Sequence, residues 1–111
     1  ARALDAASAL EAATINGARA LGRDDEIGSI EAGKQADLAL VSLSDLELQP
    51  IYSVVSHLVY VATRHQVSDV WIAGKPKLRD RRLVDIEADA LKAKARRWAQ
   101  RIADIPRGAR T

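Results

Sequence analysis

The sequence of 111 residues is long enough for one small domain, and its hydrophobic fraction of 48% is ordinary for a globular protein. It contains no cysteine, which excludes a disulfide framework and thiolate chemistry and agrees with a cytoplasmic location. The formal net charge is only +2 and no apolar run approaches the length of a membrane span, so we expect no membrane partner.

The first expected element is a helix over residues 9–21. Ser8 and Glu11 have the spacing of a capping box, in which each side chain bonds a backbone amide where a helix opens. Gly22 supplies a residue that can adopt the left-handed conformation that ends a helix. Because one face of this helix is rich in small residues, we expect it to pack closely against another element.

A short strand is expected at Leu38–Val41, buried on both faces. The chain reaches it through a tight turn in which Gly33 can adopt a positive φ. Asp37 stands directly before the strand, where an aspartate commonly binds backbone amides and orders a turn. We favour that role for Asp37 over a general base, which would need a pocket and a partner.

A hairpin is predicted further along the chain. Residues 67–73 are rich in β-branched side chains, and Ala73 with Gly74 can form the turn into a return strand over residues 75–79. Pro76 lacks an amide hydrogen, so we expect its strand to lie at a sheet edge or to pair there at a non-bonded position.

Two more helices are expected. Pro50 fits the first position of a helix whose apolar stripe runs from residue 51 to 62. The last helix is predicted to open with Asp85 as its cap and to end before Pro106 and Gly108. We expect Trp71 in the hairpin and Trp98 in the last helix to pack in the core.

Seven basic residues and one acid lie between Lys92 and Arg110. Such a cluster can attract phosphate groups, but basic side chains also complement the negative end of a helix. No aromatic residues alternate with the basic ones in the manner of a nucleic-acid reader, so we expect no nucleic-acid partner.

The sequence offers no set of residues for a catalytic metal centre. Such a centre needs at least three His or carboxylate ligands, and the chain has two histidines and no His-x-His pair. We therefore predict no catalytic, cofactor-binding or metal-binding residue in this chain. His57 is expected to be a packed, structural histidine, with a place near a substrate pocket as the weaker alternative, and His65 is expected on the surface.

Three motifs together resemble the carboxy-terminal part of the metal-dependent amidohydrolase superfamily. They are Thr-x-Asn-x-Ala-x-x-Leu-Gly at residues 14–22, Glu-x-Gly-Lys-x-Ala-Asp-Leu at residues 31–38, and Val-x-x-Ala-Gly-Lys at residues 70–75. The resemblance covers about residues 8–83 and is strongest to the methylthioadenosine/S-adenosylhomocysteine deaminase and chlorohydrolase-like group.

The resemblance implies an α+β fold that is part of a composite TIM-barrel enzyme. Residues 1–22 would be the last barrel helix, and residues 23–84 would form part of a small, incomplete β-sandwich of three or four strands with an inserted helix. Residues 85–111 would be a carboxy-terminal helix and basic tail. Five residues match positions that shape turns and pack the sandwich onto the barrel: Asn16, Gly22, Gly33, Asp37 and Gly74. Asn16 could alternatively bind a ligand.

The resemblance also implies a function for the whole enzyme. Such enzymes hydrolyse non-peptide carbon–nitrogen bonds with zinc or iron, which lowers the pKa of bound water so that hydroxide attacks an aminated ring carbon. An adenosine-type substrate is the first expectation and another amino-heterocycle the second. This chain would be an inactive scaffold segment whose partners are the missing barrel and sandwich strands of the same enzyme.

Two features of the chain qualify that expectation. The family usually has Asp-Gly-Arg after the second hairpin strand, whereas this chain has Asp80-Arg81-Arg82. Losing a glycine at a positive φ would cost about 1 kcal/mol, so the turn is expected to be rebuilt. The alternative function is a self-standing interaction module without catalysis, and in either case unpaired strand edges favour a homo-oligomer.

Overall fold

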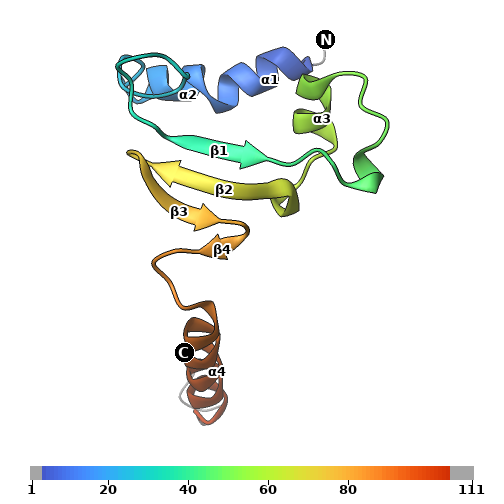
Figure 1. Cartoon of the computed structure of the whole chain (residues 1–111). Helices are drawn as coiled ribbons and strands as arrows, with labels where there is room; N and C mark the ends of the chain where they lie inside the picture. The colour runs from blue at the N-terminus through green and yellow to red at the C-terminus, as the bar shows by residue number, and fades with distance from the viewer. Residues whose placement is uncertain (1–3, 106–111) are drawn as a thin grey trace.

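The computed structural model describes residues 4–105, which form an α+β arrangement around one antiparallel sheet of four strands (Figure 1). The strands pair in chain order: β1 (Leu38–Val41), β2 (Val67–Ile72), β3 (Lys75–Arg79) and β4 (Arg82–Leu83). Helices α1 and α2 lie beside β1, with α3 at the end of α1, whereas α4 projects beyond β4 at the other end of the sheet (Figure 1). The expected α+β class and strand number are therefore confirmed.

The opening helix begins earlier than expected and is interrupted. Helix α1 spans Ala6–Ala13, and its cap is Asp5, whose carboxylate accepts the Ser8 amide at 2.7 Å. The predicted capping box of Ser8 and Glu11 is wrong, because Asp5 offers a side-chain acceptor three residues earlier. The helix breaks at Thr14, whose hydroxyl donates back to the Leu10 carbonyl at 2.7 Å.

A second short helix, α2, follows at Ile15–Ala20. Leu21 caps it, and Gly22 then turns the chain with a φ of +67°, as the sequence predicts for the residue that ends the helical segment. The single helix expected over residues 9–21 is thus two helices that meet at Thr14.

Strand β1 spans Leu38–Val41 and pairs with β2, Val67–Ile72. The strand is where the sequence places it, but it is not buried on both faces, because Leu40 is 54% exposed. Strand β1 lies at an edge of the sheet, and the described residues do not cover its outer surface.

The predicted hairpin joins β2 to β3, Lys75–Arg79. Ala73 and Gly74 both have positive φ, at +50° and +76°, which is the conformation of a type I′ turn. Strand β4, Arg82–Leu83, pairs on the far side of β3, so β3 is not an edge strand. The pair Ile72 and Lys75 closes the turn, and the next pair is Trp71 and Pro76. Antiparallel pairs alternate between hydrogen-bonded and non-hydrogen-bonded, so Pro76 lies at a non-bonded position, where its missing amide hydrogen is tolerated.

The middle helix starts later than Pro50. Helix α3 spans Val54–Tyr60, and the Ser53 hydroxyl caps it by accepting the Ser56 amide at 3.3 Å. Pro50 instead follows a cis peptide bond in the connection before the helix. Two short 3-10 helices flank this region, η1 at Leu46–Leu48 and η2 at Arg64–Gln66.

The last helix, α4, spans Ala88–Ala103 and begins after Glu87 rather than at Asp85. The Asp85 carboxylate forms an ion pair with Lys77 at 2.6 Å and so does not cap the helix. Trp98 is 53% exposed, which corrects its expected place in the core, whereas Trp71 in β2 is half-buried. Pro106 and Gly108, expected to end this helix, lie outside the described residues.

The chain has little interior of its own. Its buried residues include Ala18, Leu48 and Gln66, at 3%, 2% and 5% exposure. The radius of gyration is 19.6 Å, against about 13 Å for a compact domain of this length. The accessible surface is 9111 Å², against about 6000 Å² for a compact chain of this mass. Much of the apolar surface therefore has no cover among residues 4–105.

Candidate functional site

An open, mostly apolar groove of about 820 Å³ runs between the opening helices and β1. One wall comes from α1 and α2, the other from β1, and the loop over residues 27–30 and α3 close its ends. The lining residues are Leu10, Ala13, Thr14, Gly17, Ala18, Leu21, Ile27, Gly28, Ser29, Ile30, Asp37, Leu38, Ala39, Val41 and Leu58. A groove so poor in polar groups is suited to packing against another protein surface.

The loop after α2 lies directly on that helix, and Gly28 makes this possible. A Cβ atom on Gly28 would lie 2.6 Å from the Ala18 Cβ and 3.0 Å from the Ile15 Cα. Gly28 also has a φ of +93°, which L side chains rarely adopt. Glycine is thus required there both for its backbone conformation and for its lack of a side chain.

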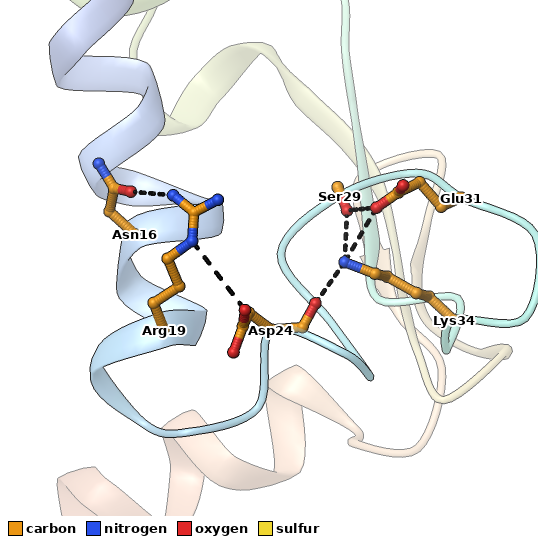
Figure 2. Close-up of polar contacts among 6 residues, drawn as sticks. All are labelled: Asn16, Arg19, Asp24, Ser29, Glu31 and Lys34. Carbon is orange, nitrogen blue, oxygen red and sulfur yellow. Dashed lines mark hydrogen bonds and ion pairs between the residues drawn. The ribbon is translucent and has the colours of Figure 1, made fainter.

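Lys34 holds the same loop in shape (Figure 2). Its ammonium group donates to the Ser29 hydroxyl at 2.7 Å and to the Asp24 carbonyl, and it pairs with the Glu31 carboxylate at 3.0 Å. The Lys34 side chain is only 12% exposed. Two contacts hold the pKa of Glu31 below its ordinary value: the hydrogen bond from the Ser29 hydroxyl has the larger effect, and the bond and positive charge of Lys34 add to it. The carboxylate therefore stays charged in this cluster.

Asn16 connects α2 to the same loop through an arginine. Its carbonyl oxygen accepts from the Arg19 guanidinium at 2.8 Å, and Arg19 faces the Asp24 carboxylate at 4.0 Å (Figure 2). Asn16 is exposed. Asn16 itself contacts Arg19 of the same helix, so the two roles left open by the sequence, a bridge to a neighbouring loop and a ligand contact, stay predictions.

Asp37 joins the entry to β1 with the β2–β3 hairpin. Its carboxylate accepts the Ala73 amide at 2.7 Å, although the two residues are 36 positions apart. Ala73 is a residue with a positive φ, and Gly74 follows it in the turn. Gly33 turns the chain before β1 with a φ of +92°, and a Cβ atom added to it would meet nothing within 4 Å. Asp37 thus orders a turn, but a distant one.

A polar cluster at the β3–β4 turn was missed by the sequence analysis. The Asp69 carboxylate accepts the Ser68 hydroxyl at 2.6 Å and the Asp80 amide at 3.2 Å. These two bonds hold the pKa of Asp69 below its ordinary value, and the bond from the Ser68 hydroxyl has the larger effect. Only the departure from the family pattern at residues 80–82 pointed to this turn.

Arg81 completes that cluster in place of the expected glycine. Asp80 and Arg81 have φ angles of +44° and +65°, so the turn keeps the left-handed conformation without glycine. The Arg81 guanidinium donates to the carbonyls of Val67 at 2.7 Å and Arg64 at 3.1 Å. The expectation that this turn is rebuilt is therefore wrong: the backbone keeps the positive φ angles, and the arginine side chain is tied to the start of β2.

The two histidines do not approach a common site. His57 in α3 is half-buried, and its Nδ1 lies 3.0 Å from the Ser53 carbonyl oxygen, outside the residues that line the groove. His65 is exposed in η2. Within residues 4–105, no group of three or more His, Asp or Glu side chains is placed to hold a metal ion. These residues therefore do not fit a catalytic zinc or iron site.

Residues 4–105 thus combine an open apolar groove, a sheet with uncovered surface and polar contacts that shape turns in one α+β arrangement. The profile of the amidohydrolase family matches residues 1–77. The chain belongs to the amidohydrolase family.

Three proteins illustrate the similarity. A 5-methylthioadenosine/S-adenosylhomocysteine deaminase from Teredinibacter turnerae is 44% identical over 92% of this chain and 23% of its own length. A zinc-bound adenosine deaminase structure from Xanthomonas campestris superimposes with a TM-score of 0.87 and 62% identity, over 93% of this chain and 24% of that one. The zinc complex of the atrazine chlorohydrolase TrzN from Arthrobacter aurescens gives a TM-score of 0.77 at 26% identity, over 85% of this chain and 20% of that one.

The chain thus spans about a quarter of the length of the relatives that it matches. Among the helices of residues 4–105, none has the length and apolar character needed to cross a membrane.

Proposed function

We propose that this chain is the carboxy-terminal scaffold segment of a metal-dependent deaminase that acts on an adenosine-type substrate. The observation that carries the proposal is the 62% identity and TM-score of 0.87 to a zinc-bound adenosine deaminase, over 93% of this chain but only 24% of that one. The other 5-methylthioadenosine/S-adenosylhomocysteine deaminases that match the chain are also only partly covered, for example 22% at 40% identity. A triazine-type substrate is the second candidate, supported by the similarity to TrzN.

In this proposal, α1 and α2 are the last helical segment of a TIM-type barrel, and β1–β4 are part of a small sandwich completed by strands from elsewhere in the enzyme. The groove of about 820 Å³ supports this, because it is open and the described residues leave its apolar lining uncovered. The exposed β1 edge supports it as well, because edge strands pair readily with further strands. The cytoplasmic location expected from the sequence belongs to the same proposal.

The catalytic metal, zinc or iron, would be held by residues outside this chain. The described side chains of His57, His65 and Asp37 are engaged with other groups or lie apart, as set out above. The contribution of this chain is to hold loops and to cover apolar surface. Lys34 and Asp37 fix the loop over residues 23–37, and Gly28 lets that loop rest on α2.

The test is a chimeric enzyme, in which this chain replaces the matching segment of the Xanthomonas campestris adenosine deaminase. We expect the chimera to bind zinc and deaminate adenosine or 5′-methylthioadenosine, as measured by ammonia release. We expect the isolated 111-residue chain to release no ammonia with the same substrates and zinc.

The control is the same enzyme cut before the matching segment, which should lose activity because its apolar surface is left uncovered. Ammonia release by the isolated chain would contradict the proposal. So would a truncated enzyme that keeps full activity, since the segment would then contribute nothing to the fold.

The isolated chain is also expected to form a homo-oligomer. Strands β1 and β4 each have one side without a partner among the described strands, and the groove is open. Light scattering at increasing protein concentration should show growth in mass. If the isolated chain forms an oligomer and the chimera shows no deaminase activity, the two results together would favour the alternative function, an interaction module without catalysis.

A further inference from the structure

Helix α4 has one apolar side that is largely exposed. Leu91, Ala95, Trp98 and Ile102 recur at intervals of four and three residues, which places them along one side of the helix. Leu91 is 54% exposed and Trp98 is 53% exposed, and no residue of α4 is buried. A helix with such a side normally covers it against another surface.

The rest of residues 4–105 provides little of that surface. The element pairs that pack most closely in residues 4–105 are α1 with α2, α1 with α3, and the neighbouring strands. Figure 1 shows α4 beyond β4, at the opposite end of the sheet from α1 and α2. Its 16 residues are barely more than the roughly 12–15 below which an isolated helix is marginally stable in water, and most helices in proteins gain their stability from packing of one side.

The charge of α4 favours a particular kind of surface. Five basic residues, Lys92, Lys94, Arg96, Arg97 and Arg101, accompany one acid, Asp89. Lys94 and Arg101 flank the apolar side, so two copies of α4 packed side by side would bring like charges together. A surface that combines apolar residues with acidic side chains would complement both features of the helix.

The comparisons indicate where such a surface would be. A match over 93% of the chain includes nearly all of α4, whichever end it omits, so α4 is shared with an adenosine deaminase chain of which this chain covers only 24%. The family profile ends at residue 77, before α4. The helix is therefore shared with deaminases although it lies beyond the match to the broader family.

We infer that the apolar side of α4 docks on the part of the same enzyme that lies outside this chain, against an apolar surface with an acidic rim. The inference rests on the proposed function. It makes α4 a second anchor, because the groove lies at the other end of the sheet. The two ends of the segment would then be held by different surfaces of one polypeptide.

Hydrogen exchange measured by mass spectrometry tests this inference on peptides that cover residues 88–103. In the isolated chain these amides should exchange quickly, because little holds the helix closed. In the chimeric enzyme they should exchange at least about tenfold more slowly. The protection should not change with protein concentration, since the docking surface belongs to the same molecule.

Two variants of the chimera locate the effect. Trp98→Glu places a negative charge on the apolar side and should return the exchange of α4 to the rate of the isolated chain. Gln100→Glu places the same charge on the opposite side of the helix, where Gln100 is exposed, and should leave the protection intact. Equal effects of the two changes would overturn the inference.

Other outcomes separate this inference from the proposed function. An active chimera in which α4 exchanges as fast as in the isolated chain would overturn the docking but not the scaffold role. Protection that grows with protein concentration would overturn it in favour of a second copy. If the chimera is inactive or does not fold, the proposed function fails. The docking of α4 can then still be tested by hydrogen exchange in a smaller chimera, in which only residues 85–105 replace the matching residues of the Xanthomonas campestris enzyme.

Discussion

At the scale of single residues, the β3–β4 turn shows how one side chain can offset an unfavourable backbone. Arg81 has a φ of +65°, a conformation that costs an L residue about 1 kcal/mol relative to glycine. Its guanidinium donates to two carbonyl groups near the start of β2, at 2.7 and 3.1 Å. Because Arg81 is exposed, we take the low end of the usual range, about 0.5 kcal/mol for each hydrogen bond and about 1 kcal/mol for the pair, so the two effects are of similar size.

Substitution of Arg81 should separate these effects. Arg81→Ala loses the hydrogen bonds and keeps the strained backbone, so the turn should be destabilised by about 1 kcal/mol. Arg81→Gly loses the same bonds but relieves the strain, so its stability should lie within about 0.5 kcal/mol of the original. The measurement is NMR hydrogen exchange of the Arg81-position amide, which donates to the Ser68 carbonyl at 2.8 Å. Equal exchange rates in the two variants would show that the backbone is not strained.

Sequence reasoning finds the residues that shape backbone more readily than their partners. Gly22, Gly33 and Gly74 all have the positive φ expected from their places after helices and in turns. The partner of Asp37 was not predictable, because Ala73 lies in another strand, and pairing at that distance depends on the register of the sheet. A carboxylate before a strand indicates that an amide will be bound, but not which one.

At the scale of elements, the position of the loop after α2 depends on close backbone approach. Gly28 and Gly33 have nearly the same φ, +93° and +92°, but very different surroundings. A Cβ on Gly28 would clash with Ala18 at 2.6 Å, whereas one on Gly33 would meet nothing within 4 Å. The two glycines therefore distinguish the cost of a backbone conformation from the cost of a steric clash.

Alanine at each position should reveal that difference. Gly33→Ala should destabilise the loop by about 1 kcal/mol, from backbone strain alone. Gly28→Ala should cost about 1–3 kcal/mol more, because the Ala18 contact forces α2 and the loop apart. The reporter is exchange of the Gln35 amide, which donates to the Glu26 carbonyl at 2.8 Å across the loop. Similar exchange in both variants would mean that the loop does not rest on α2.

Element positions were more predictable than element ends. Strand β1 and the β2–β3 hairpin lie where the apolar runs and turn residues placed them. The helix starts were misplaced because several residues compete as caps: Asp5 and Ser53 accept amides, whereas Asp85 is taken by Lys77. Only the folded arrangement decides which polar side chain is free to cap a helix.

At the scale of the whole molecule, the sequence carries amphipathic patterns whose covering surfaces are missing. Periodicity correctly predicted an apolar side for the last helix but placed Trp98 in a core, whereas among residues 4–105 it is 53% exposed. The pattern specifies which side of an element is to be covered and says nothing of which polypeptide segment covers it. That is why the burial of β1 and α4 was overestimated.

The isolated chain should therefore behave as a loosely held fold. At a concentration where light scattering reports a monomer, it should bind the apolar dye anilinonaphthalene sulfonate and unfold over a broad temperature range. The chimeric enzyme should bind the dye much more weakly, since the groove and α4 would be covered. A sharp unfolding transition without dye binding in the monomer would show that the chain is a self-sufficient domain.

The contact between Asp37 and the Ala73 amide has a consequence for how the sheet assembles. Strand β1 has only four residues, and its ladder with β2 already shifts between Leu40 and Val41, so hydrogen bonding by itself selects the alignment weakly. If β1 shifted by two residues along β2, each side chain would stay on the same face of the sheet, but the Asp37 carboxylate could no longer reach the Ala73 amide in the hairpin turn. One charged group at the strand entrance thus discriminates among otherwise similar alignments.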